Sequence, residues 1–401
     1  MSPLLRATPS DAQTPAQTPR PHIDVVQLNG LIDPIEADFL LHSIRAASDG
    51  KAVALVVQLN SPGGVISDST LNTVTSSISH SPVPVAEWVG PNGSRAYGSA
   101  YSIFRAAPLR GVAPGTHVGH APPPDPLACR TLNAEQALAQ GVATISAPTL
   151  GDFVVDLDGQ KVNGQTLDTA EVVQANGEAR RRPTVDTHFK SLGLLHQLLH
   201  TAASPSVAYL LLVIGLLLAA LEFFTAGIGI AAFCAAGCLL LTSYGLGVLP
   251  FRVWALILIA VGILGFCIDL QAGVPRVWTA VGAVTLIIGS LRLFDGVHLS
   301  PFALLAGVLG TALFMLAGMP AMVRARFSTP TIGRQSMIGE MGVALAAIEP
   351  EGTVEVRGAP WRARTNRATP IGVGDPIRVV AIDGLMLEVE PETGGAREAR
   401  H

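Results

Sequence analysis

The stretch AVALVVQLNSPGG, residues 52–64, decides the fold of the N-terminal part of the chain. Its first eight residues form a continuous apolar run, typical of a strand that is covered on both faces of a sheet. Two adjacent glycines follow at the carboxyl end of this strand. Their backbone N–H groups could face a ligand, as in an oxyanion hole, or the pair could form a purely structural turn. The residues alone leave both interpretations open.

The segments on either side of this stretch alternate between strand and helix patterns. We expect strands at residues 23–28, 52–59 and 83–89, another beginning at 112–113, and helices at 34–48, 67–79 and 98–107. Such alternation indicates βαβ units and a mostly parallel sheet. The sequence therefore predicts an α/β domain over residues 22–150. The Ser-, Thr- and Pro-rich residues 1–21 are expected to be a disordered lead, without the apolar core of a secretory signal.

The amino-acid composition excludes the class of single-domain soluble globular proteins. The chain has 401 residues, of which 49% are hydrophobic and only 14% charged, against about 25% charged in soluble domains. A net charge of -4 and a pI of about 6.2 argue against a nucleic-acid binder. Apolar runs of roughly the length that spans a bilayer occupy residues 207–227, 228–246, 253–270, 277–293 and 302–322. We therefore expect about five transmembrane helices within residues 207–323.

Arginines after the last run set the expected orientation. Arg324, Arg326 and Arg334 favour a cytoplasmic C-terminus, which with five spans puts the N-terminal domain outside the cell membrane.

The second apolar run, residues 228–246, is Gly-rich and could instead be re-entrant. Glu222 and Asp269 fall near span ends and are expected at the water interface. Because no ladder of intramembrane charges marks an ion path, a transporter or channel is disfavoured.

Residues 151–206 are predicted to hold a β-hairpin and an amphipathic linker. The hairpin is expected at residues 153–162, and the amphipathic stretch at 189–200, on the membrane surface. His196 and His200 lie one helical turn apart in this stretch and are interpreted as interfacial histidines.

The C-terminal region returns to short strands. They are expected at residues 342–348, 352–356, 361–365, 376–382 and 386–390. Five strands in this span fit a small OB-like barrel over residues 335–391, followed by a disordered tail at 392–401. Nucleic-acid binding by such a barrel needs a basic, aromatic-rich face. Trp361 is the only aromatic residue here, so a role in protein interaction is favoured.

The order of the N-terminal motifs is more specific than any one of them. Residues 60–64, 83–103, 113–119 and 132–143 together resemble the ClpP-class, crotonase-like serine protease domain. With the membrane block and the barrel, the chain resembles the long form of the NfeD family of membrane-bound proteases. The resemblance implies serine endopeptidase ancestry and a stomatin/SPFH-type membrane partner. It also implies residence in the lipid bilayer. A homo-oligomer is left open, and no nucleic-acid partner is expected.

The resemblance also implies positions for the catalytic groups. The family's serine nucleophile falls on Gly98 when residues 91–93 are aligned with its Pro-x-Gly. Ser99 is one residue later, which on a helix is a rotation of about 100°. Gly63 and Gly64 match the family's oxyanion hole.

The family's lysine base has no counterpart in this chain. The three lysines are Lys51, Lys161 and Lys190, and the segment that carries the base in the family is shortened to a Pro-rich stretch at residues 120–131. The Ser–Lys dyad is therefore absent as such. His120, with Asp125 after it, could replace the lysine in a dyad with Ser99, as in the Ser-His-Asp arrangement of ClpP.

The sequence predicts neither a metal site nor a cofactor. His117-x-x-His120 has no third ligand nearby. The four cysteines, Cys129, Cys234, Cys238 and Cys267, form no Cys-x-x-Cys pair, so neither a disulfide framework nor a zinc site is indicated. We expect a catalytically degenerate NfeD protein that acts with a stomatin/SPFH-type partner in membrane organisation or quality control. The alternative is an active membrane endopeptidase that uses Ser99 with His120.

Overall fold

The structure is a computed structural model, and it describes residues 21–175, 178–225, 229–272, 277–327, 335–365 and 370–392. The predicted lead at residues 1–20 and the predicted tail beyond residue 392 lie outside this part. The chain divides into two compact units, Met1–Met322 and Val323–His401.

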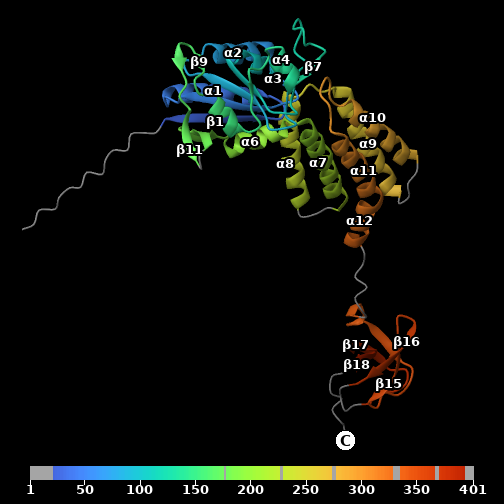
Figure 1. The fold of residues 1–401 in the computed structure, drawn as a ribbon. Helices are drawn as coiled ribbons and strands as arrows, with labels where there is room; N and C mark the ends of the chain where they lie inside the picture. Colours follow the sequence, from blue (N-terminus) through green and yellow to red (C-terminus); the bar gives the residue numbers. More distant parts are fainter. Residues whose placement is uncertain are drawn as a thin grey trace, which may run out of the picture. The chain divides into compact units, whose positions relative to one another are not determined.

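A six-stranded, all-parallel sheet organises the N-terminal part (Figure 1). Its strand order is β13-β1-β2-β3-β5-β8. The bounds are β1 His22–Asn29, β2 Ala54–Asn60, β3 Val85–Val89, β5 Leu109–Val112, β8 Ile145–Ser146 and β13 Asp186–Lys190. A smaller sheet, in the order β4-β6-β7, is formed by β4 Arg95–Tyr97, β6 His117–Gly119 and β7 Thr131–Asn133. The parallel α/β arrangement predicted from the sequence is therefore confirmed.

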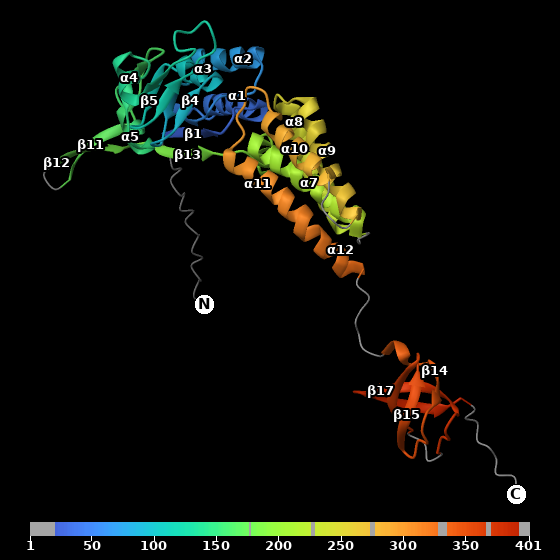
Figure 2. The same ribbon diagram turned by 90° about the vertical axis from the view of Figure 1, so that its right-hand side faces the viewer.

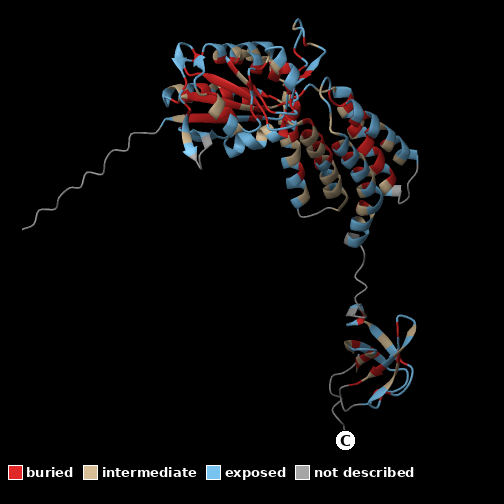
Figure 3. Cartoon of the chain, viewed as in Figure 1, coloured by how far each residue is buried: buried red, intermediate tan, exposed pale blue. Residues whose placement is uncertain are grey.

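Helices cover both faces of the large sheet, which is why its central strands β2 and β3 are mostly apolar. The helices are α1 Pro34–Asp49, α2 Asp68–Ser79, α3 Ser99–Ala106, α4 Ala134–Ala139 and α5 Leu150–Asp156. Residues of α1 to α4 pack in one core with alternate residues of β1, β2 and β3, and α5 packs in a second core on the opposite face. Figure 3 shows the sheet as the most continuously buried part of this unit.

Three details of this region differ from the sequence prediction. The hairpin expected at residues 153–162 is wrong, because residues 150–156 form α5, which Thr149 caps and which buries Phe153 against the sheet. Hairpins lie further on, as β9 Lys161–Val162 with β10 Gln165–Thr166, and β11 Ala170–Ala175 with β12 Glu178–Pro183. The strand expected to begin at residue 112 instead ends there, as β5.

The predicted linker also contributes to the sheet. Residues 186–190 form β13, which pairs in parallel with β1, so the amphipathic helix is shorter than expected. It is α6, Leu194–Ala202. Leu194, Leu195 and Leu198 on this helix are exposed. Its placement on a membrane surface stays a prediction.

Apolar helices follow α6 (Figure 2). They are α7 Pro205–Thr225, α8 Ile230–Val248, α9 Val253–Ala272, α10 Val277–Arg292 and α11 Pro301–Leu313, with α11 continuing through a π-helical turn at Phe314–Gly318 into α12 Met319–Phe327. Four helical segments within the described residues are long and apolar enough to cross a membrane, and α10, with 16 residues, is a shorter apolar helix. The span count of five therefore stays a prediction.

Glycines set the distance between α9 and α10. A Cβ on Gly282 would lie 2.7 Å from the carbonyl oxygen of Gly262, and one on Gly289 would lie 2.7 Å from that of Ala255. Small residues at such contacts let membrane helices approach closely. Asp269 accepts hydrogen bonds from the Thr279 N–H and hydroxyl, at 2.7 and 2.8 Å, so this acid caps the start of α10.

The C-terminal unit contains a closed five-stranded barrel in the order β14-β15-β16-β18-β17. Its strands are β14 Met341–Ala344, β15 Glu351–Val356, β16 Ala359–Arg364, β17 Pro376–Asp383 and β18 Met386–Pro391. The pairing of β16 with β18 is parallel and the other pairings are antiparallel. This topology is that of the OB fold, which confirms the predicted barrel.

Candidate active site

Gly98, on which the family's nucleophile is predicted to fall, lies at the start of α3. Gly98 caps this helix with φ 57° and ψ -126°, and its N–H donates to the carbonyls of Gly119 and His120. A Cβ at Gly98 would meet only the Gly63 Cα at 3.7 Å and the His120 carbonyl oxygen at 3.9 Å. A sharp, strained turn that projects a side chain is how hydrolases present their nucleophile. Here the turn is built, but the residue on it has no side chain.

The Gly63-Gly64 loop lies beside this turn. Gly63 has φ 145°, and its N–H donates to the Ser61 hydroxyl at 3.2 Å. The Gly64 N–H makes no hydrogen bond within the residues that the structure describes. The loop is fixed by a bridge to Ile32, whose N–H donates to the Gly63 carbonyl at 3.0 Å. One backbone donor of the predicted oxyanion hole is therefore free and one is engaged.

Ser99 faces this loop. A Cβ on Gly64 would lie 2.3 Å from Ser99 Oγ. This hydroxyl is buried and has no hydrogen-bond partner among the described residues. The structure thus brings Ser99 to Gly64 but forms no hydrogen bond between Ser99 and His120.

His120 is oriented by a different neighbour. It is exposed, has φ 45°, and its ring meets that of Tyr97 edge-on with centroids 5.2 Å apart. Asp125, the third member of the predicted alternative, accepts from Arg105 at 3.4 Å and from the Leu127 N–H. The pairing of Ser99 with His120 stays a prediction, and Asp125 is engaged elsewhere.

No lysine comes from the elements that form this turn. Lys51 follows the end of α1, Lys161 lies in β9, and Lys190 lies in β13 beside Asp24. Residues 121–130, where the family's base is expected, form turns rather than a helix. This agrees with the reasoning from the proline content of the segment.

Sequence reasoning missed a buried acid in the sheet next to this site. Glu87 is fully buried at the centre of β3, and neither of its oxygens has a hydrogen-bond partner within the described residues. Burial raises the pKa of Glu87 to about 8, against the opposing effect of the Arg110 guanidinium on β5. Glu87 is therefore largely protonated at neutral pH. The sequence shows only one acidic residue in a short apolar strand, which does not reveal that its carboxyl is buried with a raised pKa.

It also missed a polar cluster at the start of α1. Asp33, which caps α1, accepts from His200 Nδ1 at 3.0 Å, while His200 Nε2 donates to the Asn29 carbonyl at 3.0 Å. The hydrogen bond to Asp33 raises the pKa of His200 to about 9, and burial raises the pKa of the adjacent Glu36 to about 8. His200 is thus an imidazolium that joins α6 to the α/β domain, and its position at a membrane interface stays a prediction.

The fold defines a membrane protein with a parallel α/β domain and an OB-type barrel. Residues 206–323 match the NfeD integral membrane domain, and residues 334–391 match the NfeD-like C-terminal, partner-binding domain. The membrane block and the barrel of this chain thus each match a domain of the NfeD family.

Two relatives match along most of their length. The membrane-bound protease PH1510 of Pyrococcus horikoshii is 27% identical over 427 residues, covering 93% of this chain and 94% of the relative. The membrane protein NfeD1b of Bacillus subtilis is 22% identical over 391 residues, covering 85% and 86%. Among solved structures, 1510-N, a membrane protease specific for a stomatin homolog from P. horikoshii, is 21% identical with a TM-score of 0.37. It covers 45% of this chain and 98% of that one.

Proposed function

We propose that this chain is a catalytically degenerate member of the ClpP-class serine protease lineage. In this proposal it acts with a stomatin/SPFH-type membrane partner in membrane organisation or quality control. The observation that carries the proposal is Gly98, which occupies the strained turn at the start of α3 without a side chain. A serine protease needs an activated hydroxyl at that position.

The missing base supports the same conclusion. A hydroxyl is a weak nucleophile until a neighbouring group accepts its proton. The lysines lie on other elements, and the described turns at residues 121–130 hold none. The chain therefore keeps the glycine loop and the turn of the family while lacking both groups that transfer a proton.

The alternative is an active endopeptidase that uses Ser99. It is favoured by one observation, the buried and unpartnered Ser99 Oγ next to Gly64. In this mechanism Ser99 Oγ attacks the peptide carbonyl, and its proton passes to His120 and then to the leaving amine. It requires His120 to leave Tyr97 and reach the hydroxyl.

A fluorophosphonate probe separates the two proposals in the full-length protein. We expect no labelling of the unmodified chain. Labelling that disappears in Ser99→Ala but persists in Ser94→Ala, a matched buried serine in the loop before α3, would overturn the degenerate assignment. Gly98→Ser is the third variant: a Cβ there would meet no atom closer than 3.7 Å, and the backbone strain of φ 57° is its main cost.

The proposed partner contact lies on the barrel. Met341, Val343 and Leu345 alternate along β14 and the residue after it, and all three side chains are exposed. An apolar stripe of this kind is typical of a protein contact.

We expect the full-length chain to bind the stomatin-type protein of the same genome when both are reconstituted in one membrane. Val343→Asp should abolish this binding, and Arg362→Ala, which changes an exposed side chain on β16, should leave it intact. Binding that Val343→Asp leaves unchanged would refute this surface.

A further inference from the structure

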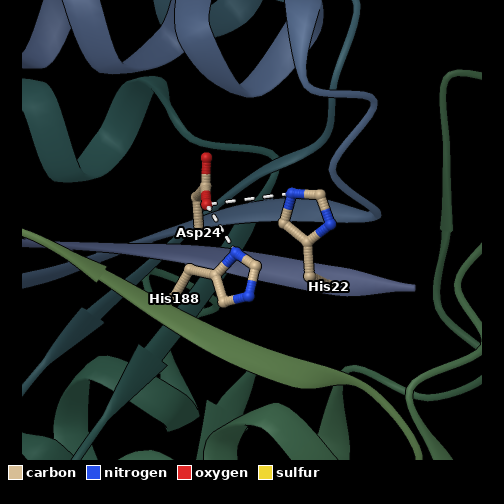
Figure 4. A group of neighbouring side chains, drawn as sticks. All are labelled: His22, Asp24 and His188. Atoms are coloured by element: carbon tan, nitrogen blue, oxygen red, sulfur yellow. Dashed lines mark ion pairs between the residues drawn. The ribbon is translucent and has the colours of Figure 1, made fainter. Parts of the chain in front are cut away.

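Two histidines and one aspartate meet where β1 and β13 begin to pair (Figure 4). His22 and Asp24 come from β1, and His188 comes from β13. One ligand atom from each residue lies within 4.8 Å of the other two. Imidazole nitrogens and carboxylate oxygens are the donors that Zn²⁺ and neighbouring divalent transition metals bind.

The parallel register of the two strands produces this juxtaposition. Asp24 pairs with His188 across the ladder, and His22, two residues before Asp24, points to the same face of the sheet. No metal site is predictable from the sequence here, because these ligands come from opposite ends of the domain. Only the pairing of β13 with β1, which the sequence did not show, brings them together.

The environment of Asp24 is the strongest indication that this cluster binds a cation. Its residue is 2% exposed, and its Oδ1 has no hydrogen-bond partner among the described residues. In Figure 4 this oxygen faces both imidazole rings, His22 Nε2 at 4.0 Å and His188 Nδ1 at 3.9 Å. A buried carboxylate oxygen without a hydrogen bond is costly unless a cation compensates its charge, and in this structure the neighbouring cation is Lys190.

The spacing fits an ion placed between the three groups. These distances are too long for hydrogen bonds. Metal bonds of about 2.0–2.2 Å in tetrahedral geometry separate neighbouring ligand atoms by roughly 3.3–3.5 Å. The two contacts to Asp24 would close by about half an ångström, and the contact between the two rings by up to about 1.3 Å, to complete three ligands. His22 and His188 lie stacked, with centroids 4.6 Å apart and planes 25° from one another, so ion binding also requires the rings to turn until their nitrogen lone pairs converge.

Lys190 competes for the same carboxylate. Its Nζ lies 3.5 Å from Asp24 Oδ1, and its side chain is 42% exposed. An exposed lysine can swing into water at little cost, so the ammonium group can give way to a divalent ion. The same contact makes a sharp prediction, because removal of the lysine charge should strengthen metal binding.

We propose that His22, Asp24 and His188 form a binding site for a divalent transition metal ion of the Zn²⁺ type. Three protein ligands leave a fourth position to water, and the site is separate from the turn at Gly98. The bound ion links β1 to β13, the strand that leads into α6 and the membrane helices.

Metal titration of the full-length protein in detergent tests this proposal. Purified, chelator-treated protein is titrated with Co²⁺, followed by its visible absorption, and the Co²⁺ is then displaced with Zn²⁺. We expect one saturable site whose bands indicate nitrogen and oxygen ligands. Absence of a saturable site at micromolar protein would overturn the proposal.

Variants assign the site to these residues. His188→Ala and Asp24→Asn should each weaken Co²⁺ binding by at least about tenfold, and Lys190→Gln should tighten it. His80→Ala, at the exposed end of α2, is the control and should bind like the unmodified chain. His188 is 53% exposed, so its removal should leave the fold intact, which thermal unfolding of the metal-free variant checks. Unchanged Co²⁺ binding by His188→Ala, or weaker binding by Lys190→Gln, would refute the assignment.

Discussion

Replacing Glu87 with glutamine should make the protein more stable at neutral pH and should remove part of its pH dependence. Glu87 is fully buried in β3, its oxygens have no hydrogen-bond partner in the described chain, and its pKa is raised to about 8. The folded protein therefore binds a proton at Glu87 that the unfolded chain releases above pH 4.5. Glutamine is a neutral substitute of the same shape and has no proton to take up.

The direction and size of the effect follow from linkage. The folded pKa is raised, so the stability associated with Glu87 is fully present below pH 4.5 and is lost as the pH rises through about 8. At 1.36 kcal/mol for each pKa unit, the loss amounts to roughly 5 kcal/mol over this range and to about 3 kcal/mol at pH 7. The glutamine variant should be more stable by amounts of this order at pH 7 and should show no gain at pH 4.5.

Amide hydrogen exchange of the β3 peptide in the full-length protein measures this difference in the domain itself. At pH 7 the variant should be protected about a hundredfold more than the unmodified chain. Other groups that titrate in this range contribute equally to both proteins and cancel in the comparison. Glu135→Gln, which changes an exposed side chain on α4, is the control. If the unmodified and Glu87→Gln proteins lose stability in parallel between pH 5 and pH 8, the reasoning is refuted.

Three further substitutions test other contacts. Gly64→Ala forces a Cβ to within 2.3 Å of Ser99 Oγ and should lower stability by roughly 1–3 kcal/mol, seen as a lower unfolding temperature. His200→Ala removes an imidazolium whose pKa is raised to about 9 by its hydrogen bond to the acid that caps α1. The pH-dependent part of its cost, about 1–2 kcal/mol after solvent screening, should be full below pH 6.5 and vanish above pH 9, as urea titrations at the two extremes would show. Gly282→Ala should destabilise the α9–α10 pair in detergent, whereas Gly310→Ala, which meets no atom within 4 Å, should not.

Local sequence patterns predicted the elements whose secondary structure is determined by their own residues and immediate neighbours. The strand at residues 54–60 has an apolar residue at nearly every position because both of its faces are covered. The helix at residues 34–49 begins with an Asp-Pro signal and has the expected spacing. The five barrel strands were separable because glycine- and proline-containing turns lie between them. In each case the deciding information lies within about ten residues.

Elements whose identity depends on distant partners were missed or misassigned. The apolar residues at 153–157 fit a strand or a helix, and their packing against the sheet as α5 decides between the two. Residues 186–190 are polar except for Phe189 and are uniformly exposed, and only their ladder with β1 makes them a strand. The position of Gly98 followed from the motif order, but its positive φ and the open space around it required the structure. His200 gave no signal because its partners lie more than 160 residues earlier in the chain.

The pairing of β13 with β1 has a mechanical consequence. β13 is the edge strand of the sheet, and the chain runs from it through α6 directly into α7. A pull from the membrane helices along this connection is directed along the strand, so it loads the β1–β13 hydrogen bonds in shear. Five residue pairs then share the load, instead of opening one after another as a peeled hairpin would. The anchorage of the α/β domain should therefore withstand tension better than the short length of β13 suggests, and β1, which leads to the Asp33 turn, would be the first element to feel that tension.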